Sequence, residues 1–132
     1  MVNVDTWLPV GSVVHIEGDD GLTVVTGYMQ QDSDTGRFWD YVGVPYPLGW
    51  TGPGRDVMFD RESIDAVYYL GLQDTDSTRM IDMLVATEPA YYEAKHEAYE
   101  ALGLPTGEVD ARLAIVAQRE ELRASRGGTH EG

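Results

Sequence analysis

The chain opens with five short blocks in which apolar and polar residues alternate, the pattern of strands that bury one face and expose the other. The blocks cover residues 12–17, 22–30, 37–44, 56–59 and 64–72, and turns rich in glycine, proline and aspartate separate them. The first turn, at residues 18–21, reads Gly-Asp-Asp-Gly and supplies the positive-φ positions of a tight hairpin. We therefore expect an antiparallel, strongly twisted sheet.

The second and third blocks carry the clearest information about this sheet. Both faces of the second block are apolar, so we expect a central strand, and Gly27 within it indicates a bulge or a close neighbour. In the third block Trp39 and Tyr41 share one face, which we expect to face the core. Pro45 and Pro47 should end this strand, because proline cannot donate to a sheet ladder.

After the last block the apolar period changes from two to that of a helix. Ser77 is placed to cap a first helix, Thr87 a second helix that ends at Gly103, and Thr106 a third. The predicted fold class is therefore α+β. We expect a twisted antiparallel sheet of about five strands, open or barrel-like, followed by two or three C-terminal helices.

The same change of pattern divides the chain. Residues 1–86 should form a β-rich domain that ends in a helix, and residues 87–126 a helical extension that packs on this domain or on a partner. Residues 127–132 should be a disordered tail. The extension could also pair with a second copy, so a homodimer stays open.

Composition narrows the class of protein. The 132 residues include no cysteine, which excludes disulfides, thiol nucleophiles and thiolate metal sites. The first five residues, Met-Val-Asn-Val-Asp, lack the basic and apolar regions of a signal peptide, and no apolar run approaches the length of a membrane span. We expect a soluble, cytoplasmic protein without a membrane segment.

The charge balance is strongly acidic, with a formal net charge of −14. Thirteen acidic and three basic residues precede Ser77, and ten acidic and six basic residues lie from Ser77 onward, which gives −10 and −4. Phosphate backbones and anionic lipids repel such a surface, so we expect no nucleic-acid or membrane partner. The charge fits either a solubilising surface or one that docks a basic partner or mimics nucleic acid.

Candidate chemistry is sparse. Glu93 and His96 have the Glu-x-x-His spacing of metal-binding bundles, but the second copy that such bundles need is missing. Asp32 and Asp34 resemble the start of a calcium loop, although the later ligands are absent and an acidic turn explains them. No serine lies in a Gly-x-Ser-x-Gly elbow, and the single lysine is not in a phosphate-binding loop. We predict no enzyme activity and no cofactor or metal.

Aromatic residues are the better candidates for function, because such side chains dominate binding hot spots. Trp39 and Tyr41 are the ones we expect in the core, whereas Trp50 lies between glycine and threonine in a loop and should be exposed. The candidate partner-binding residues are Trp39, Tyr41, Tyr46, Pro47, Trp50, Tyr91 and Tyr92.

Three blocks of the sequence together resemble one family. They read LPVGSVV from Leu8, WDYVGVPYPLGW from Trp39 and IDAVYYLGLQD from Ile64. Over about residues 7–86 the chain resembles the domain-of-unknown-function 4176 family, small proteins of Gram-positive bacteria encoded beside LXG toxins in type VII secretion clusters. The residues that carry the resemblance are Leu8, Pro9, Gly11, Ser12, Val13, Asp40, Tyr41, Tyr46, Pro47, Gly49, Ile64, Asp65, Val67, Gly71 and Asp74.

The resemblance implies a cytoplasmic accessory protein, a targeting or chaperone-like adaptor that binds a cognate LXG toxin or a small helical secretion factor. Two alternatives stay open. An acidic immunity protein or inhibitor would occupy a basic active site or nucleic-acid-binding site, and a metal-dependent enzyme would use the helix face of Glu93 and His96.

Overall fold

A computed structural model describes residues 3–130, with side chains described from residue 3 to residue 126. Within them the chain forms five strands and then two long helices, with a single turn of 3₁₀ helix, Arg61–Ser63, before the last strand. The elements are β1 (Val13–Ile16), β2 (Leu22–Gln31), β3 (Phe38–Tyr46), β4 (Val57–Phe59), β5 (Ile64–Tyr69), α1 (Thr75–Leu102) and α2 (Gly107–His130).

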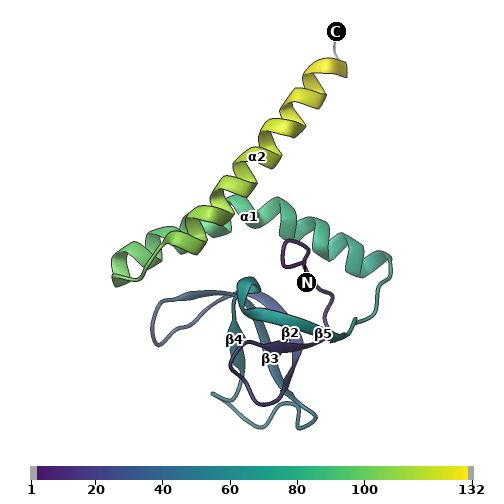
Figure 1. The fold of residues 1–132 in the computed structure, drawn as a ribbon, viewed down its shortest axis with the longest axis vertical. Coiled ribbons are helices and arrows are strands. Elements are labelled where there is room, and N and C mark those ends of the chain that lie inside the picture. Colours follow the sequence, from purple (N-terminus) through teal and green to yellow (C-terminus); the bar gives the residue numbers. More distant parts are fainter. Residues whose placement is uncertain (1–2, 131–132) are drawn as a thin grey trace. The chain divides into compact units, whose positions relative to one another are not determined.

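The strands form one sheet with the order β4-β3-β2-β1-β5, and every neighbouring pair is antiparallel (Figure 1). The α+β class with a five-stranded antiparallel sheet is therefore confirmed. The sheet is open rather than barrel-like, because the described residues of β4 and β5 form its two edges and do not pair with each other. β2, predicted to be central, lies between β3 and β1.

Two details of the sheet bear on the sequence interpretation. The β2–β3 register shifts between Val25 and Gly27, which confirms the bulge predicted at Gly27. The prediction that Pro45 ends the third strand was wrong, since β3 continues to Tyr46 and Pro45 lies opposite Thr23. Proline is tolerated there because the ladder with β4 stops at Gly43, so that edge of β3 needs no donor from residue 45.

Two helices replace the three that capping residues suggested. α1 runs without interruption through Thr87 and Pro89, so the predicted helix start at Thr87 was wrong. Buried residues recur at helical spacing on both sides of Pro89, and packing of that kind outweighs the local cost of an interior proline. The residue that caps α1 is Asp74 rather than Ser77, because its carboxylate accepts the Ser77 backbone N–H at 2.9 Å.

The end of α1 and the start of α2 are as predicted. Gly103 has a φ of 70° and its N–H bonds the carbonyl of Glu100, while the Leu104 N–H bonds that of Tyr99. These two bonds form a Schellman motif, which requires the left-handed conformation that glycine adopts easily. Thr106 immediately precedes α2, and its hydroxyl donates to the Asp110 carboxylate at 2.9 Å.

The chain divides into two compact units, Met1–Val85 and Ala86–Gly132. The first unit contains the sheet and the beginning of α1, and the second contains the rest of α1 and α2. Residues 127–130 of the expected tail form the last turn of α2, and residues 131–132 lie outside the described part of the chain. Neither helix, within the residues described, is both long and apolar enough to cross a membrane.

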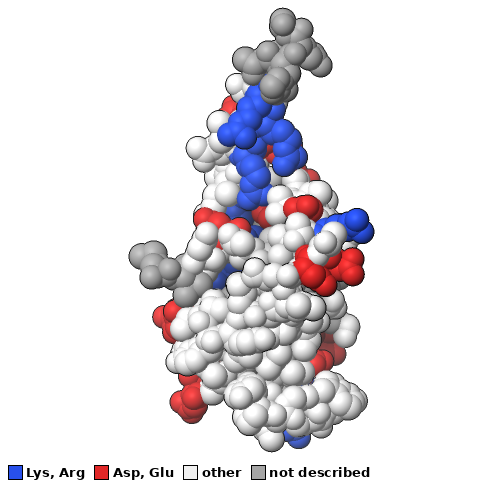
Figure 2. All heavy atoms as spheres, turned by 90° about the vertical axis from the view of Figure 1, so that its right-hand side faces the viewer, with Lys and Arg blue, Asp and Glu red and all other residues white. Residues whose placement is uncertain are grey.

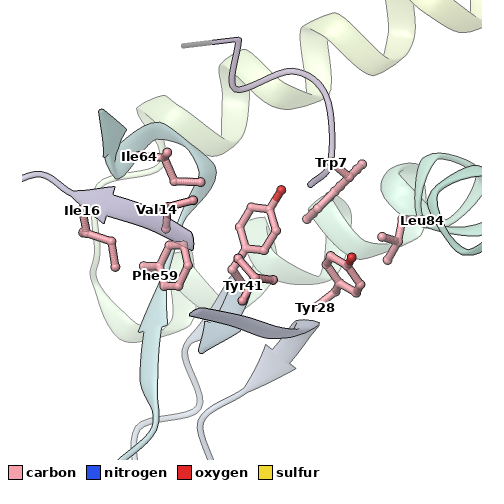
Figure 3. Packing of buried hydrophobic residues seen from close by; sticks show 9 residues of the cluster. Trp7, Val14, Ile16, Tyr28, Tyr41, Phe59, Ile64 and Leu84 are labelled. Atoms are coloured by element: carbon pink, nitrogen blue, oxygen red, sulfur yellow. The ribbon is translucent and has the colours of Figure 1, made fainter. Parts of the chain in front are cut away.

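An aromatic cluster forms the core of the first unit. The rings of Trp7 and Tyr28 meet edge to face at 5.9 Å, Trp7 and Tyr41 at 5.2 Å, and Tyr41 stacks on Phe59 at 5.3 Å. Leu84 from the first part of α1 joins this cluster (Figure 3). Aliphatic residues from β1, β2 and the start of β5 complete the cluster: Val14, Ile16, Val25 and Ile64.

Candidate protein-binding surface

The segment before β1 is fixed to the sheet by hydrogen bonds to the backbone of Leu8. The Leu8 N–H donates to the Tyr41 hydroxyl at 2.8 Å, and the Tyr28 hydroxyl donates to the Leu8 carbonyl at 2.6 Å. Burial raises the pKa of both tyrosines above its usual value, so the hydroxyls stay protonated and keep these roles at neutral pH. Tyr41 is therefore a core residue, as predicted from the alternation, and does not lie on the surface.

Ser12 connects this segment to the chain that leaves β5. Its buried hydroxyl donates to the Pro9 carbonyl at 2.7 Å and accepts the Gly71 N–H at 3.0 Å. Gly71 must be glycine at this crossing, because a Cβ there would overlap the Val10 carbonyl oxygen. Ser12 belongs to the LPVGSVV block and Gly71 to the IDAVYYLGLQD block. Both are needed to hold this crossing, which fixes the course of the chain just after β5.

That part of the chain is the most apolar exposed stretch of the described sequence. We call residues 64–72 the edge segment. Tyr68 is 66% exposed and Tyr69 64% exposed, and beyond β5 Leu70 is 45% and Leu72 74% exposed. Val10, whose carbonyl lies beside Gly71, is exposed as well. Clustered apolar side chains of this kind mark protein interaction sites more often than scattered ones do.

The strand part of the edge segment, β5, also lies at an edge of the sheet. β5 pairs only with β1 among the described strands, so its other side lies at the sheet edge. An edge strand in an antiparallel sheet leaves alternate N–H and C=O groups without a ladder partner. The opposite edge, β4, is only 3 residues long, a length that offers little for another strand to pair with.

Acidic groups surround the edge segment. No lysine or arginine occurs between Glu62 and Thr78, whereas Asp65, Asp74 and Asp76 all lie there and are exposed. Figure 2 shows the side of the first unit on which β5 leads into α1 (Figure 1), where a broad uncharged surface has acidic side chains and a few basic ones at its margins. The edge segment therefore combines apolar side chains with a negative field.

A histidine on β1, His15, lies opposite the beginning of the edge segment. His15 Nδ1 is 2.6 Å from a carboxylate oxygen of Asp65, and its Nε2 is 2.8 Å from the Asp19 carbonyl oxygen. The hydrogen bond to Asp65 raises the pKa of His15 above its ordinary value, and the contact with the Asp19 carbonyl raises it further. The pair joins β1 to β5 beside the ladder that the two strands form.

The candidate residues of the WDYVGVPYPLGW block lie in different environments. Tyr46, Pro47 and Trp50 are exposed at the end of β3 and in the loop that follows, with Trp50 64% exposed, as predicted. Trp39 is half-buried on β3, and the guanidinium carbon of Arg37 lies 3.9 Å above its ring. The exposed members therefore lie at the end of β3 and in the following loop, beyond the residues of β3 that pair with β4.

Tyr91 and Tyr92 are buried in the second unit rather than exposed. Their rings meet at 4.9 Å, and the ammonium nitrogen of the buried Lys95 lies 5.8 Å from each ring centre. Arg119 on α2 reaches the buried Glu88 carboxylate on α1 at 3.4 Å. The Glu88–Arg119 ion pair joins the two helices, whereas the contacts of Tyr91, Tyr92 and Lys95 with one another lie within α1.

The candidate metal ligands are distributed over surface contacts. His96 is 3.4 Å from the Glu100 carboxylate and 3.0 Å from that of Asp110, which links α1 to the start of α2. The Asp32 carboxylate accepts the Asp34 N–H at 2.9 Å, a local turn contact. Within the described residues, no three histidine, aspartate or glutamate side chains are placed to hold a metal ion.

The exposure of Tyr68, Tyr69, Leu70 and Leu72 was not predicted from the sequence. The strand itself was expected, but consecutive apolar residues indicate burial on both faces and give no sign of an edge. The charge pattern gives no distinguishing signal either, since residues 1–36 also contain no lysine or arginine.

Comparison with known proteins gives one match. The model of a family described as Domain of unknown function (DUF4176) matches residues 7–80. The match covers all five strands and the first turn of α1, so it includes the whole edge segment. No curated protein and no solved structure matches the chain.

Proposed function

The chain belongs to the domain-of-unknown-function 4176 family, and from that premise we propose that it is a protein-binding adaptor for a secreted LXG-type toxin. The adaptor binds the toxin in the cytoplasm of a Gram-positive bacterium and presents it to the type VII secretion system. It works by binding alone and carries out no chemical step on its partner.

The edge segment is the observation that supports this proposal most strongly. Its tyrosines and leucines present apolar area to water in the free protein, and burying this area against a partner would stabilise the complex by roughly 25 cal/mol per Å². Tyrosines such as Tyr68 and Tyr69 are typical hot-spot residues. The segment lies in the region that the family model matches, as expected for a surface that serves the family's common role.

Co-expression tests the proposal directly. The tagged chain is produced together with the LXG toxin encoded beside it, and the toxin is supplied whole, as its amino-terminal part and as its catalytic part. We expect a complex that survives size-exclusion chromatography with the whole toxin and with the amino-terminal part. If neither form co-elutes with the chain, the adaptor function is wrong.

A matched pair of variants connects the complex to the edge segment. The double variant Tyr68→Ser and Leu72→Ser removes two exposed apolar side chains from the segment, and Leu122→Ser removes an exposed apolar side chain from α2. We expect the double variant to weaken the complex at least about tenfold and the α2 variant to leave it intact. If both variants weaken the complex equally, the toxin does not bind at the edge segment.

A second candidate function follows from the charge of −14. An acidic immunity protein would bind the basic catalytic part of the toxin and protect the producing cell. The same experiment separates the two functions, because an immunity protein would co-elute with the catalytic part and an adaptor with the amino-terminal part.

A further inference from the structure

We propose that the partner contributes an extended, positively charged segment that pairs with β5 and becomes a sixth strand of the sheet. The inference deepens the adaptor function and rests on it for the identity of the partner, but it specifies the conformation and charge of the bound segment. Its basis is the coincidence of a free strand edge, exposed apolar side chains and a negative field at one place in the chain.

The strand edge determines the conformation of the occupant. A helix laid on this surface would satisfy none of the backbone groups that an edge strand presents, whereas an extended segment pairs with them directly. The exposed side chains on both faces of β5 would then flank side chains of the added strand, as cross-strand neighbours do. Tyr68 and Tyr69, both exposed, provide aromatic contacts for the added strand.

The irregular pairing of β5 sets the length of the added strand. The register with β1 shifts twice, which leaves Asp65 and Tyr68 as extra residues between the paired positions. Bulges of this kind increase the local twist and re-aim the side chains that they contain. They also blunt an edge against long, flat strands, so the occupant is a short segment.

The charges determine the sign of the occupant. Asp65 lies near one end of the edge segment, and His15 bridges its carboxylate to the Asp19 carbonyl on the β1–β2 turn, where Asp19 and Asp20 are exposed acids. Asp74 and Asp76 follow the other end. A segment with basic residues at its ends would therefore meet opposite charge on both sides, while its apolar middle would meet the tyrosines.

The same field argues against a second copy of this chain as the occupant. Pairing of two β5 strands would bring together two molecules that each carry a formal charge of −14, with acidic groups at both ends of each strand. Such a contact would need high salt to form. The occupant that the observations favour is a basic strand from another protein.

The test uses the full-length ¹⁵N-labelled chain and synthetic peptides of about nine residues, long enough to follow the segment at roughly 3.3 Å per residue. The first peptide alternates lysine or threonine with valine, the second replaces each lysine by glutamate, and the third is a helix-forming peptide of alanine and the same number of lysines. Amide chemical shifts and hydrogen-exchange rates are measured with up to about 1 mM peptide, at low and high salt.

We expect the cationic strand peptide alone to shift the amides of residues 64–72 and to slow exchange of alternate amides of β5 several-fold. The affinity should fall about three- to tenfold in the double variant Asp65→Asn and Asp76→Asn, which removes charge near the segment. The matched control, Glu120→Gln and Glu121→Gln on α2, removes the same charge elsewhere and should leave the affinity unchanged.

Several results would overturn the proposal. They are no shift in residues 64–72 with the cationic strand peptide, equal binding of the glutamate peptide, or tighter binding of the helical peptide. Concentration-dependent shifts of β5 without any peptide would show that a second copy is the occupant. The peptides contain no toxin sequence, so the two proposals can fail separately. If the toxin co-elutes with the chain but the cationic strand peptide does not bind, only the pairing of a strand with β5 is rejected. If the toxin does not co-elute, only the adaptor function is rejected.

Discussion

The crossing of the chain at Ser12 provides the sharpest prediction of stability. Replacing Ser12 by alanine removes the hydroxyl that joins Pro9 to Gly71 without disturbing the backbone around it. The Pro9 carbonyl then loses one of its two hydrogen bonds, because it still accepts the backbone N–H of residue 12 at 3.2 Å. The Gly71 N–H lies in a buried position and depends on the hydroxyl.

The magnitude follows from these two contacts. A buried N–H that loses its acceptor costs about 1–3 kcal/mol, and a hydrogen bond that is lost while the other group keeps a partner costs about 0.5–1.5 kcal/mol. We therefore expect Ser12→Ala to lower the free energy of unfolding of the first unit by about 2–3 kcal/mol. For a unit of this size that loss corresponds to a fall in melting temperature of roughly 10–20 °C.

Tryptophan fluorescence is the appropriate assay, because all three tryptophans, Trp7, Trp39 and Trp50, lie in the first unit. Urea unfolding of Ser12→Ala is compared with that of Ser63→Ala, whose hydroxyl makes a single hydrogen bond of the same length, 2.7 Å, to the Asp60 carbonyl. The bridging role of Ser12 would be refuted if Ser12→Ala lowers the free energy of unfolding by less than about 0.5 kcal/mol, or by no more than Ser63→Ala does.

Two further predictions concern the sheet. Gly43→Ala should destabilise the first unit by more than about 2 kcal/mol, because its Cβ would overlap the Val24 carbonyl oxygen, whereas Gly21→Ala, with open space around it, should change urea unfolding little. The pKa of His15 is raised in the folded chain, so its contact with Asp65 stabilises the fold. This contribution to the free energy of unfolding should be complete below the unfolded pKa of about 6.5 and should be lost as the pH rises through the higher folded pKa. In His15→Gln the free energy of unfolding should not show this decline with pH.

The strands could be predicted from the sequence because their signals are local. Alternation within residues 12–17 and 22–30 and the glycines of the turn between them specify a hairpin whatever the rest of the chain does. The bulge at Gly27 follows the same logic, since a residue without a side chain favours such an irregularity. The order of the strands is set by non-local pairing, and no local pattern indicates that β5 pairs with β1 at an edge.

Helix boundaries inside α1 could not be predicted from capping residues. Thr87 is a good cap by type, but the helix passes through it because buried residues continue at helical spacing past Pro89. Burial of the helix tyrosines was equally hidden. Tyr91 and Tyr92 are the same residue type as Tyr68, and only the three-dimensional packing decides that Tyr68 is exposed and the other two are not.

Hydrogen–deuterium exchange of the full-length chain, alone and with the amino-terminal part of the LXG toxin, tests the central claim most directly. We expect peptides covering residues 64–72 to exchange more slowly in the complex, while those covering α2 exchange as in the free chain. Protection confined to α2, or to the loop that carries Trp50, with residues 64–72 unchanged, would contradict it.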